Sequence, residues 1–438
     1  MNFLNDLAAR RRFGMKPGLD TIRAVCAALG DPQRKFKAIH VAGTNGKGAV
    51  CATLDAVLRN VRIFESSNVR LRVGRYTSPH LVKINERFFL DGAPTDDRVL
   101  EGAAERVNSS IRTFEHSDIT FFEALTAVAF ELYAEAKVDY AILECGLGGR
   151  LDATNVCDPA LSVITRIGLD HCDWLGDTVE EIAAEKAGIV KPGVPVVLGR
   201  NEPAVRAVIE TRAREVGAPF HYAPDLADEG EVPADFPIAG AFNRENAVTA
   251  LAALRVLAAR EEDGEKRLCW TPELPSSVCW PGRFQRVGTF IVDGAHNPPA
   301  ARALRGALES ADFGHKTFDL ICGFCGDKDV GEVLSILAPL VRKGYAVRTN
   351  NPRSLTAEET AAKMRAAGIG ATACGSLKEA IELAGRRTED GRQALICGSL
   401  FLAGEALVEL GAYPWDASRF DKSELLRGDP CVLRQDRV

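Results

Sequence analysis

A glycine-rich segment near the amino terminus has the residue types of a phosphate-binding loop. Between an apolar run at 37–43 and a helical pattern at 49–60, the chain reads Gly43-Thr44-Asn45-Gly46-Lys47-Gly48. Glycines let backbone N–H groups turn inward around phosphate oxygens, and the following helix adds a partial positive charge at its N-terminus. Lys47 would neutralise the β- and γ-phosphates. Because strand, loop, lysine and helix agree, the segment predicts a nucleotide-phosphate site rather than a bare glycine turn.

The loop lacks one usual component. Walker-type loops place a Ser or Thr hydroxyl after the lysine, where it binds magnesium. Here Lys47 is followed by Gly48 and Ala49. Magnesium must then be held by side chains elsewhere in the chain.

Two polar side chains lie near the ends of apolar, strand-like runs. Glu144 is at the end of the run 138–146 and precedes glycines, and His171 follows the similar run 160–168. Ligand sites of open α/β sheets lie at the carboxyl ends of the strands, and an unpaired carboxylate inside a strand would be costly. A salt-bridged structural glutamate and a core histidine are the alternatives. Beside a phosphate loop, metal-ligand roles are favoured for both residues.

The elements that must position these residues follow an α/β pattern. Short apolar runs alternate with helical patterns over about the first 280 residues, as in a P-loop-type, mostly parallel sheet. A further strand is expected at 195–199, and a helix is expected at 243–260. A smaller Rossmann-like α/β domain follows, and its strands are expected at 289–296, 318–326, 345–349 and 394–400. The predicted domains are 1–285 and 286–438, and a cleft between two such domains is a common place for substrates.

Composition excludes several other classes of protein. The 438 residues are 46% hydrophobic and 26% charged, with a formal net charge of −6, which gives no reason to expect nucleic acid or a membrane surface as partner. No signal-peptide core and no membrane-length apolar run is present, so a cytoplasmic protein with reduced thiols is expected. Cys322 and Cys325 have zinc or redox spacing, but no second close pair accompanies them.

The phosphate loop carries a family resemblance. HVAGTNGKGAV (40–50) resembles the ATP loop of the Mur ligase superfamily, and the glycine after Lys47 is similar to its folylpolyglutamate synthase and dihydrofolate synthase branch. That branch usually has Ser at the position of Ala49, so one hydroxyl next to the phosphates is missing here. Four more segments resemble the family in the same order, and the resemblance spans nearly the whole chain: 76–88, 141–155, 168–176 and 185–193.

The resemblance implies a role for one residue in each of these segments. Ser78, Glu144 and His171 would bind Mg²⁺, and Lys186 matches a lysine that is typically carbamylated in the superfamily. The sequence cannot show that modification. It also leaves open whether K⁺ takes part.

The second domain contributes its own set through the same resemblance. FIVDGAHNPPA (290–300) resembles the segment that faces the nucleotide, which implies nucleotide contacts from Asp293 and Asn297 and a catalytic role for His296. Arg283 matches a linker arginine that reaches an ATP phosphate, for which its planar fork is suited; a surface linker charge is the alternative. GFCGDKDV (323–330) and ICGSLFLAGE (396–405) are further markers, the latter placing Ser399 near the glutamate end.

The resemblance implies an ATP-dependent ligase. A pteroate or folate carboxylate would be activated as an acyl phosphate and joined to L-glutamate. Asp152 in GGRLDATN is similar to the form in bacterial enzymes that also use dihydropteroate, and its two oxygens could bond a pterin's amino groups. Phe122 could stack on the pterin face. A loop carboxylate and a core aromatic are the alternatives, so use of both dihydropteroate and tetrahydrofolate is the leading hypothesis.

Two other functions remain open at this stage. One is a cell-wall Mur-type peptide ligase, against which the TSPH and NERF segments and the glycine after Lys47 argue. The other is a non-catalytic relative that binds nucleotide or folate, favoured by Ala49 and by the charged link at 61–76. Every inferred magnesium ligand and phosphate-facing cation is present, which favours an enzyme, and the family resemblance favours a monomer.

Overall fold

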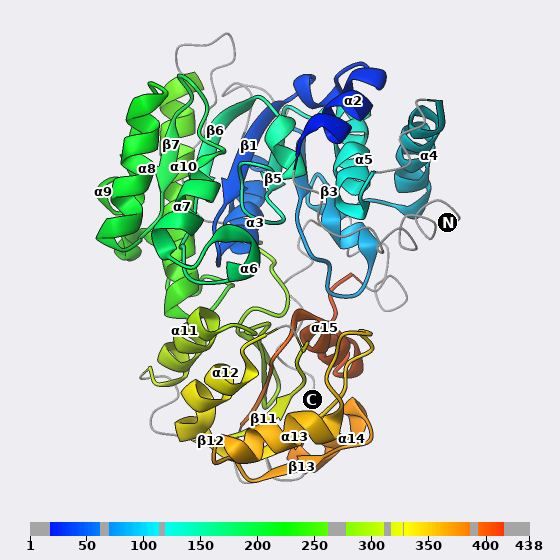
Figure 1. Cartoon of the computed structure of the whole chain (residues 1–438), viewed down its shortest axis with the longest axis vertical. Helices are drawn as coiled ribbons and strands as arrows, with labels where there is room; N and C mark the ends of the chain where they lie inside the picture. The colour runs from blue at the N-terminus through cyan, green and yellow to red at the C-terminus, as the bar shows by residue number, and fades with distance from the viewer. Residues whose placement is uncertain are drawn as a thin grey trace. The chain divides into compact units, whose positions relative to one another are not determined.

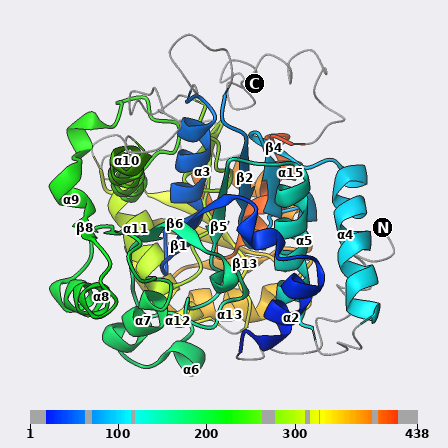
Figure 2. The same cartoon turned by 90° about the horizontal axis from the view of Figure 1, so that it is seen from above.

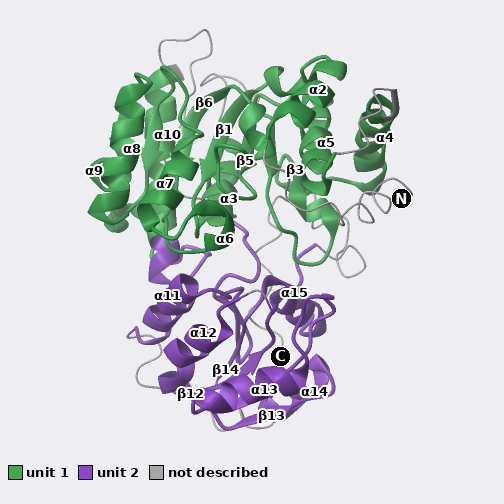
Figure 3. Cartoon of the chain, in the orientation of Figure 1, with its two compact units in different colours: residues 1–234, 245–275 green, residues 235–244, 276–438 purple. Residues whose placement is uncertain are grey.

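The computed structural model describes residues 18–61, 70–113, 119–261, 277–310, 317–326, 328–385 and 393–415 (Figure 1). The chain divides into two compact units (Figure 3). Unit 1 comprises residues 1–234 and 245–275, and unit 2 comprises 235–244 and 276–438. Unit 2 is therefore discontinuous in sequence, and the single boundary after residue 285 stays a prediction.

Unit 1 is built on an eight-stranded sheet of order β4-β3-β2-β5-β1-β6-β7-β8. The six strands from β2 to β8 are parallel, while β3 and β4 add an antiparallel edge. This confirms the predicted mostly parallel α/β fold. The strands are β1 (Lys37–Ala42), β2 (Val73–Tyr76), β3 (Phe88–Leu90), β4 (Ala93–Pro94), β5 (Tyr140–Glu144), β6 (Pro159–Ile164), β7 (Val196–Leu198) and β8 (Phe220–Tyr222).

Helices cover both faces of this sheet, and Figure 2 shows α3 on one side of the strands with α2 and α7 on the other. The α-helices are α2 (Asp20–Ala28), α3 (Lys47–Leu58), α4 (Asp97–Thr113), α5 (Phe121–Glu135), α6 (Cys172–Leu175), α7 (Val179–Ala187), α8 (Pro203–Glu215), α9 (Ala223–Leu226) and α10 (Ala241–Glu261). Short 3-10 turns are η2 (Pro32–Arg34), η3 (Ile84–Arg87), η4 (Ala153–Val156) and η5 (Glu229–Glu231).

One large core lies where α2, α4 and α5 pack on the sheet. Leu125, Phe130 and Tyr133 of α5 are fully buried in it with Tyr76 of β2. Each such side chain contributes about 1.5–3 kcal/mol by leaving water. Thr120 caps α5 by accepting from the Glu123 N–H, a signal that is readable in the sequence. This packing fixes β5 and its neighbours, and so fixes the sheet edge that bears the site.

The strand β2 lies within residues 61–76, which the sequence pattern predicted to be a charged link. The strand carries Arg75, which is buried rather than solvent-exposed. Its guanidinium lies 3.5 Å from Asp55 on α3 and 3.8 Å from the ring centroid of Phe89. A charge pair between helix and strand thus takes the place of an apolar contact, and the apolar pattern that marks buried strands is interrupted there.

Unit 2 contains a six-stranded sheet of order β13-β12-β11-β14-β10-β9, parallel except for the β9–β10 pair. The strands are β9 (Gln285–Val287), β10 (Phe290–Val292), β11 (Phe318–Cys322), β12 (Val341–Ala346), β13 (Ala371–Ala373) and β14 (Ala394–Cys397). The helices are α11 (Pro298–Leu308), α12 (Val330–Leu337), η6 (Ala338–Leu340), α13 (Ala357–Ala366), α14 (Leu377–Gly385) and α15 (Leu400–Glu409). The smaller Rossmann-like α/β domain is thereby confirmed.

The prediction of β12 at 345–349 was shifted along the chain. The strand begins at Val341 and includes Arg342 and Lys343. Because these two residues are charged, the first half of the strand lacks the apolar pattern that predicts a strand. Arg342 pairs at 2.7 Å with Asp319, a buried carboxylate on the neighbouring strand β11. A cross-strand charge pair again replaces the expected apolar contact.

The cysteines are mostly buried thiols. Cys322 Sγ lies 3.4 Å from Met364 Sδ, and burial raises the pKa of the Cys322 thiol. Cys325 is also a buried thiol. Cys279 is disulfide-bonded, which departs from the expectation of reduced cysteines. In the part of the chain that the structure describes, no helix has the length and apolar character needed to cross a membrane.

Candidate active site

The phosphate loop joins β1 to α3 through two glycines with positive φ. Gly43 has φ of 149° and Gly46, which caps α3, has φ of 90°. A Cβ on Gly43 would lie 1.9 Å from Thr165 Oγ1, and one on Gly46 would lie 2.2 Å from Asn246 Oδ1. No side chain fits at either position, so the backbone is the surface that this loop presents.

The loop is held by the segment that follows β6. The N–H groups of Thr44 and Asn45 donate to Arg166 O at 2.9 and 3.2 Å, and Thr165 Oγ1 donates to Asn45 O at 2.8 Å. The Thr44 hydroxyl donates to Gly168 O at 3.0 Å. These bonds occupy the first amides of the loop. The amides at the start of α3 have no partner within the helix, as a phosphate site requires.

Lys47 lies at the N-terminus of α3. Its ammonium donates to Gly43 O at 3.1 Å and to Thr44 O at 3.2 Å, and it is 4.0 Å from Glu144 Oε1. The side chain is 16% exposed. The ammonium therefore lies in a partly buried position between the loop carbonyls and a carboxylate, where it could donate a further hydrogen bond to a phosphate oxygen.

Glu144 is the last residue of β5, opposite Val41 of β1 in the parallel ladder. Only 4% exposed, it accepts the Ser78 N–H through Oε2 at 3.0 Å. The structure thus brings together Lys47, Glu144 and Ser78 from three neighbouring strand ends. This is the arrangement that the strand-end reasoning predicted for the first two.

The third predicted metal ligand, His171, lies on a more open loop. It has φ of 54°, its side chain is 42% exposed, and Nε2 is 3.9 Å from Asp170 Oδ1. Among the described residues, no group of three or more His, Cys, Asp or Glu side chains is placed to hold a metal ion. The structure shows a Ser78–Glu144 contact and leaves the role of His171 a prediction.

Lys186 lies on α7 and is 3% exposed. Burial, and then the charge of Lys47, lower its pKa to about 7, opposed by Cys145, Asp170 and Asp152. A lysine in this state is partly neutral near physiological pH, so its amine can act as a nucleophile.

Asp152 is bonded within its own loop. Its Oδ2 accepts the N–H groups of Gly146 and Leu147, both at 2.9 Å, and Oδ1 accepts the Thr154 N–H at 3.0 Å and the Thr154 hydroxyl at 2.5 Å. Burial raises its pKa against these bonds. The loop-carboxylate alternative describes all four contacts, and a pterin contact stays a prediction.

Phe122 lies against the same loop. A Cβ on Gly146 would come within 2.6 Å of the Phe122 ring, and the ring centroid is 6.0 Å from that of Tyr76. The ring is half-buried beside the core. It therefore borders the strand-end site without being enclosed in it.

In unit 2 the predicted residues also follow a parallel strand. Asp293 comes directly after β10, is 4% exposed, and accepts the N–H groups of Phe284 at 2.7 Å and Ala295 at 2.8 Å. Burial raises its pKa, and the nearby Arg283 opposes this. Arg283 lies over Gly294, where a Cβ would be 2.3 Å from its guanidinium. The carboxylate therefore fixes the backbone around the arginine.

The remaining unit 2 candidates are held by local bonds. Asn297 caps α11 by accepting the Ala300 N–H at 2.9 Å, and Ser399 caps α15 by accepting the Leu402 N–H at 3.0 Å. His296 Nδ1 is 2.8 Å from Gly294 O. Asn297 and Ser399 have clear structural roles, and their ligand contacts stay predictions.

Sequence reasoning missed three residues that shape the site in unit 1. Thr165 and Asn246 lie against the two loop glycines, and Asp170 lies beside His171 and acts on the charge of Lys186. Only Asp170 had a signal, since it is an acid next to a candidate ligand. The other two come close through tertiary packing.

Comparison with known proteins gives the same family in both units. Residues 41–216 match the Mur ligase middle domain, and residues 282–400 match the Mur ligase glutamate ligase domain. The dihydrofolate synthase/folylpolyglutamate synthase of Bacillus subtilis is 33% identical over 380 residues, covering 80% of this chain and 85% of that protein.

Solved structures agree over almost the full length. Escherichia coli FolC in complex with DHPP and ADP is 30% identical with a TM-score of 0.76, covering 94% of this chain and 98% of that one. The Yersinia pestis bifunctional folylpolyglutamate synthase/dihydrofolate synthase with Mn, AMPPNP and L-glutamate bound is 30% identical with a TM-score of 0.75, covering 93% and 98%. With its glycine loop, strand-end lysine and carboxylate, and two α/β units, the chain belongs to the dihydrofolate synthase/folylpolyglutamate synthase family of ATP-dependent Mur ligases.

Proposed function

We propose that this ligase carries out both reactions of its family, adding L-glutamate to dihydropteroate and to tetrahydrofolate at the expense of ATP. The observation that carries this proposal is the convergence of Lys47, Glu144 and Ser78 at the carboxyl edge of the unit 1 sheet. One relative of 30% identity binds ADP together with DHPP, and another binds AMPPNP together with L-glutamate. These bound molecules support a nucleotide, a pterin compound and glutamate as the ligands of this chain.

The residues present fit a nucleotide and a divalent cation. Thr165 and Asn246 occupy the positions where a Cβ of Gly43 or Gly46 would lie, so the loop presents its backbone, and Lys47 borders that backbone. Glu144 and the Ser78 hydroxyl supply the oxygen donors that Mg²⁺ prefers, and His171 would complete the set. When bound, Mg²⁺ would neutralise phosphate charge. A possible contribution of K⁺ has no residue assigned to it here.

The chain's own groups account for binding and charge stabilisation. In the first step a carboxylate oxygen of the pteroate or folate bonds to the γ-phosphorus of ATP. The bond between that phosphorus and the β,γ-bridging oxygen breaks, which gives an acyl phosphate and ADP. Lys47 stabilises negative charge on the transferring group, as electrostatic catalysis of phosphoryl transfer requires. We assign Arg283, Asp293, His296 and Asn297 to the nucleotide-facing part of unit 2.

In the second step the α-amine of glutamate bonds to the acyl carbon and phosphate leaves. The protein must hold the amine in its neutral form next to that carbon and keep water from the reactive acyl phosphate. We assign Ser399 to the glutamate end, and Phe122 and Asp152 to the pterin end. Phe122 can offer a ring face there, while Asp152 keeps the Gly146–Leu147 backbone in position.

We also propose that Lys186 becomes carbamylated. Its amine, with a pKa of about 7, is available to attack CO₂; the nitrogen–carbon bond forms and one proton is released to solvent. The resulting anion would relieve the repulsion between Lys186 and Lys47. Incorporation of ¹³C-labelled CO₂, read by NMR and lost in Lys186→Met, tests this step.

A product assay tests the function. Purified protein is supplied with Mg-ATP, L-glutamate and either dihydropteroate or tetrahydrofolate, while mass spectrometry counts added glutamates and released ADP is measured. Product from both substrates supports the proposal. Product from one alone restricts the enzyme to that activity, and ATP binding without product from either would favour a non-catalytic relative. Sedimentation of the same preparation tests the proposed monomer.

A further inference from the structure

Asn201 lies just after β7, at the edge of the unit 1 sheet that carries the phosphate loop. Its carboxamide makes three hydrogen bonds to backbone groups. Oδ1 accepts the Ile167 N–H at 2.8 Å, and Nδ2 donates to Thr165 O and to Gly199 O, both at 3.1 Å. Exchanging its oxygen and nitrogen would place the NH₂ group against an N–H and the oxygen against two carbonyls, so these partners fix the orientation of the amide. Asn201 is therefore bonded to the two peptide groups that flank Arg166.

One of these two peptide groups also binds the phosphate loop. The peptide group between Arg166 and Ile167 presents its carbonyl to the N–H groups of Thr44 and Asn45, at 2.9 and 3.2 Å. Because this peptide is trans, its carbonyl and its N–H point in opposite directions. The N–H faces away from the loop and donates to Asn201 Oδ1. This bond fixes the rotation of the whole planar group, and so fixes the direction of the carbonyl that holds the loop.

The side chain of Asn201 continues the hydrogen bonding of β7 beyond the end of that strand. β7 ends at Leu198, and the Gly199 N–H donates to the carbonyl of the last residue of β6 at 2.8 Å. α8 begins at Pro203, so the chain leaves the sheet within these few residues. Because Ile167 is buried, its N–H needs a partner from the protein. The Asn201 carboxamide supplies that partner in the way that the backbone of a neighbouring strand would.

The phosphate loop depends on the segment 165–168 for its shape. Besides the two bonds to Arg166 O, Thr165 Oγ1 donates to Asn45 O at 2.8 Å, and the Thr44 hydroxyl donates to Gly168 O at 3.0 Å. A shift of this segment would therefore move the backbone of the loop, which is the surface that the loop presents to phosphate. Displacements of about 1 Å in such a site can reduce activity by about 10²-fold.

We propose that Asn201 is a positioning residue for nucleotide binding. It holds the peptide group between Arg166 and Ile167 in the orientation that fixes the phosphate loop, and it acts through the backbone of 165–168 rather than by contact with ATP. The proposal concerns the nucleotide alone, so it does not depend on which folate the enzyme uses.

Calorimetric titration of the full chain with ADP, together with thermal unfolding, tests the proposal. Asn201→Ala removes all three bonds, and we expect ADP to bind about tenfold more weakly and Tm to fall by about 2–4 °C. In the product assay the KM for ATP should rise to a similar extent, while the KM for L-glutamate stays within about twofold of the wild-type value. A lower Tm with unchanged ADP affinity would show a purely structural role and overturn the proposal.

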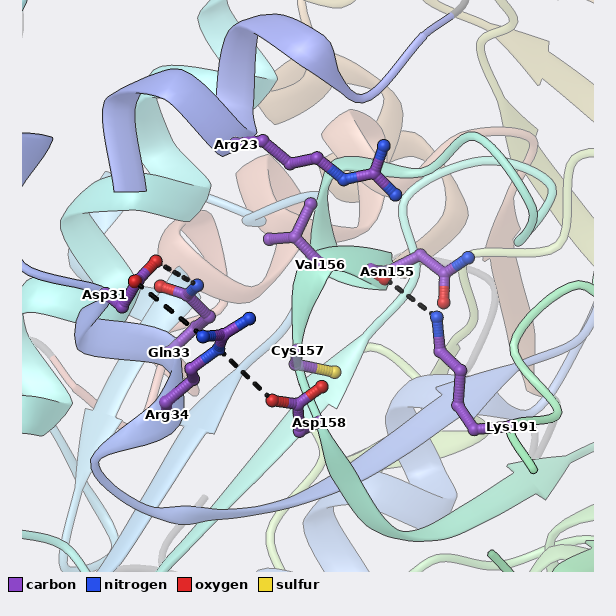
Figure 4. A pocket seen from close by; sticks show the side chains of 9 residues that line it. All are labelled: Arg23, Asp31, Gln33, Arg34, Asn155, Val156, Cys157, Asp158 and Lys191. Atoms are coloured by element: carbon purple, nitrogen blue, oxygen red, sulfur yellow. Dashed lines mark hydrogen bonds and ion pairs between the residues drawn. The ribbon is translucent and has the colours of Figure 1, made fainter. Parts of the chain in front are cut away.

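Gln33 provides the matched control, because it is a buried carboxamide at the opposite edge of the same sheet. It precedes β1 and lines a polar cavity of about 320 Å³, where its Nε2 donates to Asp31 Oδ1 at 3.0 Å (Figure 4). The six residues of β1 separate this edge from the phosphate loop by about 20 Å. Gln33→Ala should lower Tm by a similar amount and leave the affinity for ADP unchanged. An equal loss of ADP affinity in both variants would mean that general destabilisation weakens binding, which would contradict the proposal.

A second variant keeps the proposal testable if Asn201→Ala fails to fold. Asn201→Ser, whose hydroxyl can replace one of the bonds, should give an intermediate ADP affinity and faster amide hydrogen exchange at Thr44 and Asn45. Combining it with Thr165→Val, which removes the bond to Asn45 O, should weaken binding by less than the product of the two single effects, because both act through the same segment. Wild-type affinity in Asn201→Ser at a lowered Tm, or single effects that multiply in the double variant, would overturn the proposal.

Discussion

The carboxyl edges of the two parallel sheets carry polar residues at corresponding places but use them differently. In unit 1, Lys47 and Glu144 are 4.0 Å apart, and Lys186 is buried with a pKa near 7. In unit 2, Asn297 and Ser399 are committed to helix caps with bonds of 2.9 and 3.0 Å. Unit 1 thus holds a buried amine and a long ion pair at its sheet edge, whereas unit 2 uses polar side chains at its sheet edge to cap helices.

This difference indicates that buried charges, which reduce the stability of the folded chain, are kept at the unit 1 site. A buried amine and a loosely paired carboxylate reduce stability unless a ligand or modification compensates. Helix caps increase stability on their own. We therefore expect substitutions of Lys47 in unit 1 to change turnover, whereas substitutions at the unit 2 caps should change mainly the free energy of unfolding.

The largest expected effect is that of Lys47→Ala. Removing the cation from the loop should lower turnover by about 10³-fold, because charge on the transferring phosphoryl loses its partner. Circular dichroism should show an unchanged fold, and Lys35→Ala, an exposed lysine before β1, serves as the control. A variant with near-wild-type turnover would refute the role of this loop.

The next effect concerns the stability cost of Lys186. Its folded-state pKa of about 7 lies below the ordinary 10.5, so the unfolded state binds more protons between these values, and the free energy of unfolding should rise with pH in that window. Lys186→Met removes this dependence and should be more stable by about 2–5 kcal/mol at pH 7. Denaturant titrations in CO₂-free buffer at pH 7 and pH 10 measure it. Parallel pH profiles for both proteins would contradict the assignment.

Asp152→Asn should have an intermediate effect. Its carboxylate accepts four hydrogen bonds, and the amide cannot accept all of them, so we expect a loss of about 2–3 kcal/mol of unfolding free energy. Turnover should fall alike with dihydropteroate and tetrahydrofolate. Asp235→Asn, at an exposed position, is the matched control. A selective loss with dihydropteroate, at unchanged stability, would instead establish a pterin contact.

The smallest effects are expected at the unit 2 caps. Asn297→Ala and Ser399→Ala should each reduce the free energy of unfolding by about 1 kcal/mol, and Asn297→Asp should retain most of it because aspartate also caps. Thermal unfolding of the four proteins tests this order. If stability stays unchanged while the KM for ATP or glutamate rises, these residues are ligand contacts and the contrast between the units is lost.

The strands and site residues that could be predicted from the sequence are those marked by apolar runs and glycines. β1, β5 and β14 were found because they are mainly apolar segments, and Lys47 and Glu144 were placed by the strand ends next to them. β2 was missed because Arg75 interrupts its pattern, and its partner Asp55 lies 20 residues earlier. No pattern among neighbouring residues predicts an ion pair between side chains so far apart in the sequence.

The roles of Asn297 and Ser399 were ambiguous for a different reason. A residue that caps a helix and one that binds a ligand at a helix N-terminus have the same side-chain types and the same position. Asn297 before two prolines fits both descriptions. Only the hydrogen bond that Asn297 Oδ1 accepts from the Ala300 N–H in the structure shows that the cap is made.

The discontinuity of unit 2 has a consequence for any attempt to express it alone. Residues 235–244 belong to it, and Ala239 and Phe242 from this segment pack on its core. The Phe242 ring stands at 90° to that of Phe284, with centroids 6.4 Å apart. A fragment beginning at 276 lacks Phe242 and would expose the Phe284 ring to water, whereas a fusion that joins 235–244 to residue 276 would keep the Phe284 ring covered.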